Sequence, residues 1–195
     1  IHPALLPLFG GPGYYGEKNE KETLKSITKN LKTLQKKFKK EKISVKIGLE
    51  TMGKQKVFGS LDEILEICKN VKGVFPVIGL VHIHARSNGS LKKREDFELI
   101  FDKVDELKLD EYLIHLTGVL YENGNEYYHI PIKKGDMPIN PLIEYILDTK
   151  KDVTFISESP LVEHDAVYIR LQVEKAIMKR VEREEADYRD LSEII

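Results

Sequence analysis

The sequence has little of several features that mark whole classes of protein. Its 195 residues include one cysteine, which excludes a disulfide framework and a cysteine-rich zinc module. That residue, Cys68, lies on the apolar side of a predicted helix, so we expect a core residue and not a nucleophile. No run of roughly 18 apolar residues is present, so no membrane span is predicted. No secretory segment opens the chain, which makes the cytoplasm the expected location.

Charge of neither sign predominates. Lys and Arg number 31, Asp and Glu number 32, and the formal net charge is −1, with 41% apolar residues. Such a composition is typical of a globular protein and not of a disordered one. Any nucleic-acid site must therefore be local. Two predicted loops, 51–59 and 85–94, are basic and contain no acid, and their cations are Lys54, Lys56, Arg86, Lys92, Lys93 and Arg94.

Apolar spacing predicts short strands that alternate with amphipathic helices. Strands are expected at 43–50, 74–81, 112–117 and 153–158, and residues 1–3 are interpreted as a further strand end. Helices are expected at 20–40, 60–70, 93–108 and 140–147 and from 165 onward. Local signals support these ends: a capping box at Ser60 and Glu63, a cap at Asn140 before Pro141, and an Asn123-Gly124 turn inside a long loop.

Strands that alternate with helices predict parallel βαβ units in an α/β fold. A closed TIM (β/α)8 barrel has eight such units in about 250 residues, and the five units predicted here fit its C-terminal part. We therefore expect residues 1–195 to form a single domain, with the N-terminal units of the barrel missing. An open, doubly wound sheet is the alternative architecture.

The predicted strand ends carry imidazoles and carboxylates. The carboxyl ends of barrel strands meet at one mouth, where the chemistry of such proteins is found. Histidine and glutamate are ligand types for zinc and manganese, so their recurrence predicts a metal centre. Its expected members are His2, Glu50, His82, His115, Glu158 and, in the loop after His115, His129. His84 would point away from His82 in an extended chain, and we expect a structural role for it.

These residues lie in short motifs whose order and spacing resemble the endonuclease IV family. That family comprises metal-dependent apurinic/apyrimidinic endonucleases (family 2) within the xylose-isomerase-like barrel superfamily. The resemblance covers essentially the whole chain. The motifs are Ile1-His2-Pro3 with Gly13-Tyr14-Tyr15-Gly16, Gly48-Leu49-Glu50-Thr51, His82-Ile83-His84-Ala85-Arg86, His115-Leu116-Thr117-Gly118, His129-Ile130-Pro131-Ile132 and Ser157-Glu158-Ser159.

The resemblance implies a site for up to three metal ions, usually zinc, with manganese as an alternative. It implies that His2 serves the first metal and that Glu50 bridges the first two. The remaining implied ligands are His115 and Glu158 for the second metal, and His82 and His129 for the third. A further first-metal histidine of the family would lie upstream of Ile1.

The resemblance also implies an activity and a partner. The expected enzyme is a hydrolase of DNA repair that cuts double-stranded DNA on the 5′ side of abasic sites. Glu158 and Glu50 would hold and polarise the attacking water on the metals. The expected DNA contacts are Tyr14 and Tyr15, which could stack on a nucleotide, and Lys54 and Arg86, which could meet the backbone.

Two positions depart from the family pattern. Gly79 stands where the family has an acidic ligand, and Tyr127 stands where it has an aspartate, although Glu126 is adjacent and could substitute. Fewer than three metals are therefore expected. Two alternatives stay open: a sugar isomerase or epimerase of the same superfamily, with Glu50, His115 and Glu158 around its metal, and a degenerate relative without catalysis.

Overall fold

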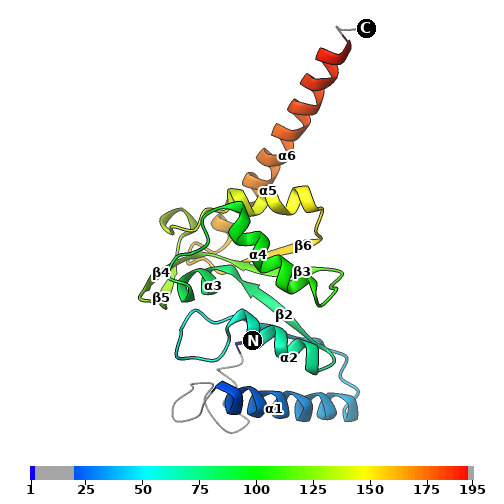
Figure 1. Ribbon diagram of the computed structural model, residues 1–195, viewed down its shortest axis with the longest axis vertical. Coiled ribbons are helices and arrows are strands. Elements are labelled where there is room, and N and C mark those ends of the chain that lie inside the picture. Colours follow the sequence, from blue (N-terminus) through cyan, green and yellow to red (C-terminus); the bar gives the residue numbers. More distant parts are fainter. Residues whose placement is uncertain (3–19, 193–195) are drawn as a thin grey trace.

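A four-stranded parallel sheet forms the centre of the molecule. The computed structural model describes residues 1–2 and 20–192 (Figure 1). In the sheet the strands stand in the order β1 (Ile47–Glu50), β2 (Val74–Gly79), β3 (Tyr112–Leu116) and β6 (Val153–Ser157). Each strand therefore lies beside the next parallel strand along the chain, with helices in the connections between them.

This strand order confirms the predicted α/β fold and identifies the sheet as part of a barrel wall. An open, doubly wound sheet reverses its strand order at a switch point, and no reversal occurs among the described strands. The doubly wound fold often carries the phosphate-binding glycine spacing G-x-G-x-x-G. This spacing occurs here at Gly11, Gly13 and Gly16, so the glycine pattern does not exclude the doubly wound fold. The strand order excludes it. Ile1 continues the same pattern: its N–H donates to the Gly48 carbonyl, and its carbonyl accepts from the Glu50 N–H, as in a parallel ladder.

The predicted strand at 43–50 is too long at its start. β1 begins at Ile47, which pairs with Val74, the first residue of β2. Upstream, Ile43 and Val45 have no described partner strand and are 41% and 60% exposed. The alternation of apolar residues at 43–49 thus extends beyond the paired segment.

The predicted strand at 74–81 is too long at its end. β2 stops at Gly79, and the chain turns directly into helix α3 (Leu80–Arg86). The Thr51 side chain fixes this junction, because its hydroxyl lies 3.0 Å from the carbonyl and 3.1 Å from the amide of Gly79. The segment after Gly79, expected to be strand and loop, is therefore helical.

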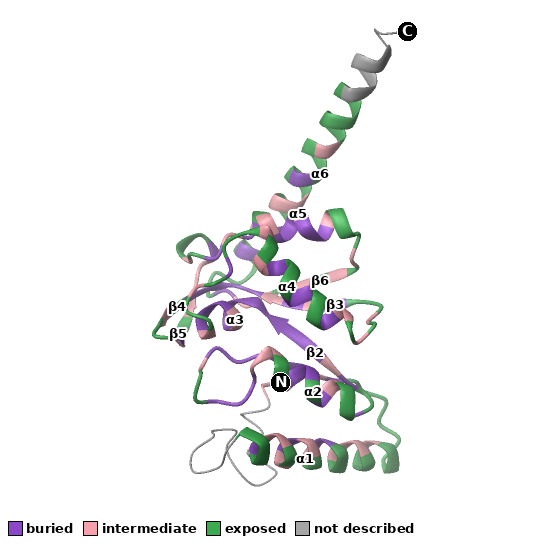
Figure 2. Cartoon of the chain, viewed as in Figure 1, coloured by how far each residue is buried: buried purple, intermediate pink, exposed green. Residues whose placement is uncertain are grey.

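The longer helices occur where the apolar spacing predicts them, with shifted ends. The Ser60–Glu63 capping box is present, whereas the predicted Asn140 cap is wrong, since the helix includes Asn140 and its cap is Ile139. Buried residues concentrate on β1, β2 and β3 and on the inner sides of the helices (Figure 2). The helices are α1 (Glu20–Lys40), α2 (Leu61–Asn70), α4 (Arg94–Asp105), α5 (Asn140–Thr149) and α6 (Glu163–Ser192).

A β-hairpin occupies the segment that the sequence predicted to be a long loop. It consists of β4 (Gly118–Glu122) and β5 (Asn125–Ile130), joined by the Asn123-Gly124 turn. Both turn residues have positive φ, 49° and 74°, as a tight hairpin turn requires. The hairpin packs against α3, and His129 on β5 reaches the main-chain carbonyl of Glu158, the residue directly after β6.

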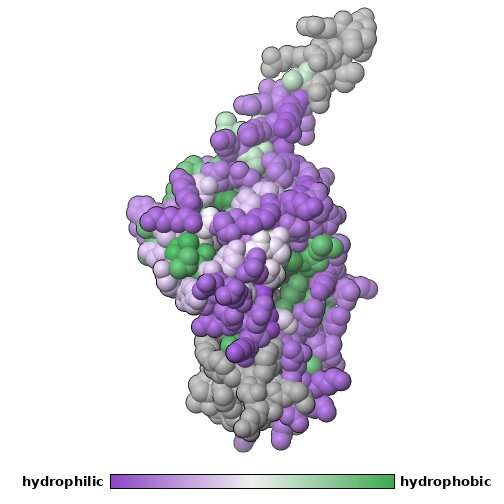
Figure 3. All heavy atoms as spheres, turned by 60° about the vertical axis from the view of Figure 1, so that its left-hand side comes forward, coloured by the Kyte–Doolittle hydropathy of each residue, from purple (hydrophilic) through white to green (hydrophobic). Residues whose placement is uncertain are grey.

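Helix α6 projects away from the rest of the molecule (Figure 1). On the face shown in Figure 3, the part of this helix that is not drawn in grey is mostly hydrophilic, with scattered apolar residues. None of the helices in the described ranges has the length and apolar character needed to cross a membrane.

The environment of Cys68 predicts an unreactive thiol. Burial raises its pKa to about 12, so only about one molecule in 10⁴ carries the reactive thiolate at pH 8. We expect alkylation by iodoacetamide to be about a thousandfold slower than that of an unperturbed thiol with pKa near 8.5. Mass spectrometry of a time course would measure this rate, with urea-unfolded protein as the reactive control. Rapid alkylation of the folded protein would contradict the core assignment.

Candidate metal centre

The structure brings together all six residues that the sequence proposed as ligands. Each comes from a different part of the fold, near the carboxyl ends of the strands. Glu50 ends β1, His115 is the fourth residue of β3, and Glu158 follows β6 directly. His82 comes from the first turn of α3, His129 from β5, and His2 from the described start of the chain beside β1. Their roles as ligands stay a prediction.

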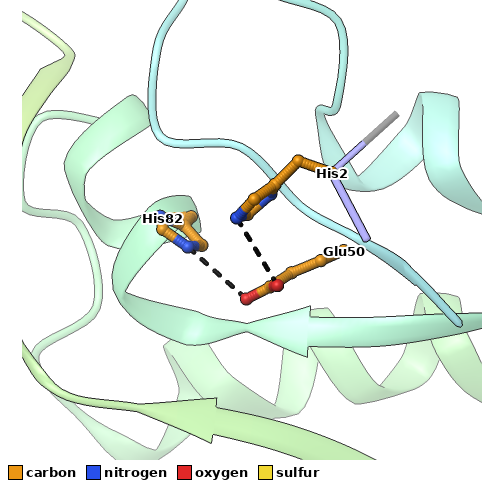
Figure 4. A group of neighbouring side chains, drawn as sticks. All are labelled: His2, Glu50 and His82. Carbon is orange, nitrogen blue, oxygen red and sulfur yellow. Dashed lines mark ion pairs between the residues drawn. The ribbon is translucent and has the colours of Figure 1, made fainter. Parts of the chain in front are cut away.

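Glu50 is the centre of this group. Its side chain is 5% exposed, and its carboxylate faces three imidazoles, of which those of His2 and His82 are drawn in Figure 4. Oε2 lies 3.5 Å from Nε2 of His2, and Oε1 lies 3.4 Å from Nε2 of His82. Oε1 also accepts a hydrogen bond of 2.8 Å from Nδ1 of His115. A buried carboxylate is costly without such partners, so the histidines hold Glu50 in place.

These contacts change the acidity of the central residues. Burial favours the neutral carboxyl of Glu50, but the hydrogen bond from His115 and the nearby imidazoles of His82 and His2 outweigh it and hold its pKa well below the usual range. Burial disfavours a charged His82, yet contacts with Glu126 and Glu50 outweigh it and raise the pKa of His82 to about 9. For His115, Glu158 and Glu50 likewise overcome burial and raise its pKa to about 9. For His2 burial dominates and lowers the pKa.

Glu158 links His115 to His129. Its Oε1 lies 3.0 Å from Nδ1 of His115, and this contact lowers the pKa of Glu158 more than burial raises it. Its main-chain carbonyl accepts a 3.2 Å hydrogen bond from Nδ1 of His129. That bond leaves Nε2 of His129 as the nitrogen with the lone pair, because a neutral imidazole protonated at Nδ1 has its acceptor at Nε2.

The donor set fits a cluster of metal ions. Three groups each have ligand atoms within 4.8 Å of one another, and each group shares residues with another. Buried atoms lacking a hydrogen-bond partner among the described residues include His2 Nδ1, His82 Nε2 and Glu158 Oε2, all of ligand type. Buried polar atoms are normally satisfied, so atoms of this kind are suited to metal ions. The groups are His2, Glu50 and His82; His82, His129 and Glu158; and Glu50, His115 and Glu158.

Sequence reasoning did not assign Glu126 to the site. Its carboxylate is 13% exposed and forms a short ion pair with Nδ1 of His82. Tyr127, at the position where a ligand was sought, is 57% exposed and its hydroxyl donates to Glu122. The only sign of Glu126 in the sequence is that it precedes Tyr127, the position of the family's aspartate. The irregular pairing of β5, which brings Glu126 to the site, is not visible in the sequence.

His84 has the structural role expected of it, for a different geometric reason. It lies on α3 with His82, and two residues along a helix correspond to opposite sides. His84 is fully buried: Nδ1 accepts from the Leu91 N–H, and Nε2 lies 3.0 Å from Asp136. Asp136 also binds Lys92 and the Tyr121 hydroxyl, so this cluster fastens α3 to the hairpin and to the loop before α5.

The basic loops contribute less free charge than their sequences suggest. In loop 85–94, Lys92 pairs with Asp136, Lys93 with Glu95 and Arg94 with Asp148. Arg86 donates to the main-chain carbonyls of Met52, Lys54, Gln55 and Val57, and so shapes loop 51–59. Lys54 and Lys56 have no acidic partner within 4.0 Å among the described residues. Tyr14 and Tyr15 lie outside the described residues.

Comparison with known proteins places the chain in a family. Residues 5–180 match the family model described as xylose isomerase-like TIM barrel. The chain belongs to the xylose isomerase-like TIM barrel family. An uncharacterized protein of Methanocaldococcus jannaschii is 32% identical over 162 residues, which cover 81% of this chain and 59% of that protein. The chain thus spans less than two thirds of the length of this relative.

Two solved structures show the same fold as this xylose isomerase-like chain. A D-tagatose 3-epimerase-like protein aligns with a TM-score of 0.57 and 22% identity, over 87% of this chain and 62% of that one. Endonuclease IV from Thermus thermophilus aligns with a TM-score of 0.54 and 16% identity, over 80% of this chain and 58% of that one. At such identities the likeness establishes the barrel fold and leaves the activity to be argued from the site.

The raised pKa values of His82 and His115 predict opposite effects of pH on the metal-free and zinc-loaded protein. A histidine pKa raised from 6.5 to about 9 stabilises the metal-free fold fully below pH 6.5, and this stabilisation is lost as the pH rises through 9. Zinc needs the deprotonated imidazoles. Between pH 6.5 and 9 we therefore expect the Tm in EDTA to fall and the Tm increase caused by zinc to grow. Calorimetry would measure both, and a zinc effect independent of pH would contradict the assignment.

Proposed function

We propose that the protein is a metal-dependent phosphodiesterase that cuts DNA on the 5′ side of abasic sites. The single observation that supports this most strongly is the set of three overlapping ligand groups linked by Glu50, His82 and Glu158. Overlapping groups suit adjacent metal ions, and adjacent divalent ions suit the hydrolysis of a phosphodiester. Zinc is the proposed metal because the donors are imidazoles and carboxylates, with manganese as the second choice.

The proposed roles follow from the positions of the side chains. Bound metal ions would lower the pKa of a water molecule and stabilise charge on the attacking and leaving oxygens. Glu50, central and buried, offers one oxygen to His2 and the other to His82 and His115, as a bridging carboxylate would. Glu158 presents the orphaned Oε2 beside this bridge, which supports a role in holding the attacking water. Four neutral imidazoles leave more positive charge for a phosphate than carboxylates would.

DNA contact is proposed for the loop beside the site. Loop 51–59 begins immediately after Glu50, and Lys54 and Lys56 have no described acidic partner there. Because Arg86 holds the carbonyls of this loop, the loop has a defined shape at the site. Lysines placed in this way provide sequence-independent contact with a phosphate backbone. For Arg86 we propose that any effect on DNA binding is exerted through the loop.

Sugar epimerisation is the second candidate. It is favoured by one observation, the compact group of Glu50, His115 and Glu158, which on its own would hold one metal beside a small substrate. His2, His82 and His129 exceed what such a single-metal site needs, and their inclusion in ligand groups with Glu50 or Glu158 favours the endonuclease. The two candidates differ in substrate, so a direct assay separates them.

Substitution of Glu158 tests the proposed role. Glu158→Gln in the intact protein should lower incision of an abasic-site duplex at least about 100-fold, because a neutral amide is a poor metal ligand and several kcal/mol of charge stabilisation are lost. Glu163→Gln, an exposed change at the start of α6, is the matched control and should leave the rate unchanged. Gel electrophoresis of a labelled duplex measures the rate, and circular dichroism checks the fold. Full activity of the Glu158→Gln variant would show the role to be wrong.

Substrate choice tests the function itself. The intact protein, loaded with zinc or manganese, should cut a duplex with one abasic analogue on the 5′ side of the lesion and should lose this activity in EDTA. The same preparations should leave D-tagatose and D-fructose unchanged in chromatographic epimerisation assays. Metal-dependent conversion of a ketose without DNA incision would favour the epimerase. Neither activity, with metal bound, would favour a relative without catalysis.

A further inference from the structure

We infer that Glu126 is the positioning residue of the metal centre: it accepts the Nδ1 proton of His82 and thereby points Nε2 of His82 at the metal shared with His2 and Glu50. This inference rests on the metal site of the proposed function. His82 belongs both to the group of His2 and Glu50 and to that of His129 and Glu158. The inference assigns its Nε2 to the first group, because Nε2 lies 3.4 Å from Oε1 of Glu50, whereas the family resemblance implied the third metal for it. Three observations support it: a bulge in the hairpin, the space beside Gly53 and Gly79, and the different surroundings of the two nitrogens of His82.

An irregularity in the hairpin places Glu126 on the side of the site. Val119 pairs with His129 and Leu120 with Tyr128, but Tyr121 pairs with Glu126. Tyr127 is thus an extra, unpaired residue, which is a β-bulge. In a regular strand the residue two before His129 would share its face. The bulge shifts this phase by one, so Glu126 shares the inward face with His129 and Val119.

The exposures of the side chains agree with this phase. Tyr127 and Tyr128 are consecutive and both face outward, at 57% and 60% exposed. The inward positions are covered, since Val119 is 4% exposed and the Glu126 side chain 13%. The bulge therefore replaces the acid missing at Tyr127 with the carboxylate of the preceding residue, whose side chain is one methylene longer than aspartate.

Two glycines provide the space for the Glu126–His82 pair. A Cβ atom on Gly53 would collide with the Glu126 carboxylate, and the Glu126 N–H also donates to the Gly53 carbonyl at 2.9 Å. A Cβ atom on Gly79 would lie 2.5 Å from Cδ2 of His82 and 2.9 Å from Oε1 of Glu50. Real Cβ contacts are longer than this, so any side chain at Gly79 would displace the His82 ring. Glycine in place of the family's acid at position 79 therefore leaves the space that the His82 ring occupies.

The two nitrogens of His82 have different surroundings. Nδ1 is paired with Glu126, while Nε2 is buried, lacks a hydrogen-bond partner among the described residues and lies 3.4 Å from Glu50. Metal-binding histidines commonly donate their second N–H to a carboxylate, which fixes the tautomer and the ring orientation. Glu126 is suited to this role, and Nε2 is then the atom that faces the metal.

Zinc affinity of the intact protein tests the inference. Glu126→Ala should weaken zinc binding at the His82 site by about 10- to 100-fold, the usual effect of removing such a partner. Glu126→Gln should weaken it less than about tenfold, because the amide oxygen still accepts from Nδ1. Glu122→Gln, an exposed acid on the same hairpin, is the matched control and should bind as the wild type. Competition with a chromophoric chelator measures affinity, and elemental analysis measures the number of zinc ions.

A second variant and a spectroscopic measurement keep the test decisive if Glu126→Ala folds poorly. Gly53→Ala should act like Glu126→Ala, because it displaces the carboxylate while leaving it in the chain. In ¹⁵N-histidine NMR of the zinc-loaded protein, His82 should be protonated at Nδ1 and metal-bound at Nε2. A His82 bound through Nδ1, or the loss of one zinc equivalent in Glu126→Gln, would overturn the inference and make Glu126 a ligand.

The other outcomes separate this inference from the proposed function. Unchanged zinc affinity in Glu126→Ala, with DNA incision by the wild type, would overturn the inference alone. The expected affinity losses without DNA incision by the wild type would support the inference and overturn the proposed function. A wild-type protein that binds no zinc would overturn both.

Discussion

The structure of the site depends on one buried carboxylate. Glu50 ends the first described strand of the sheet, and three imidazoles from three separate segments meet its two oxygens. A desolvated carboxylate with fewer partners would be neutral or unstable, so Glu50 and its histidines need one another even in the metal-free protein. The same arrangement makes the centre ready for metal ions, since ions would replace protons between groups that are already close together.

Support for this centre comes from side chains that the proposed chemistry does not use. Arg86 donates hydrogen bonds to main-chain carbonyls of loop 51–59, which follows Glu50 and contains Gly53. On the other side of α3, His84 and Asp136 fasten the helix that carries His82. Helix α3 is thus held on both sides, and the His82 ring lies between two fixed surfaces. Metal ligands bind well only when surrounding residues hold their side chains in the required geometry.

The sequence predicted the parallel strands and the six converging residues correctly, because each depends on a local pattern. Alternating strands and helices give parallel units, and the carboxyl ends of such strands share one edge. The hairpin and its bulge were not predictable in this way. Tyr127 is left unpaired because Leu120 and Tyr121 of β4 pair with Tyr128 and Glu126, and this register depends on the whole hairpin. For that reason the sequence offered Glu126 only as a possible substitute for the missing aspartate and did not assign it to the site. The boundaries of β1 depended on Val74, a residue far along the chain, and the N-cap of α5 differed from its apparent signal by one residue.

The spread of the site over the chain has a consequence for how the protein folds. His2 and Glu158 are more than 150 residues apart in the sequence, and the ligands between them come from successive βα units and the hairpin. Contacts between positions so far apart form late, because long loops must close before such contacts add stability. The centre is therefore complete only when β6, which precedes Glu158 directly, has joined the sheet. A metal ion held by the whole set would bind the finished fold in preference to any intermediate, and would slow unfolding more than it accelerates folding.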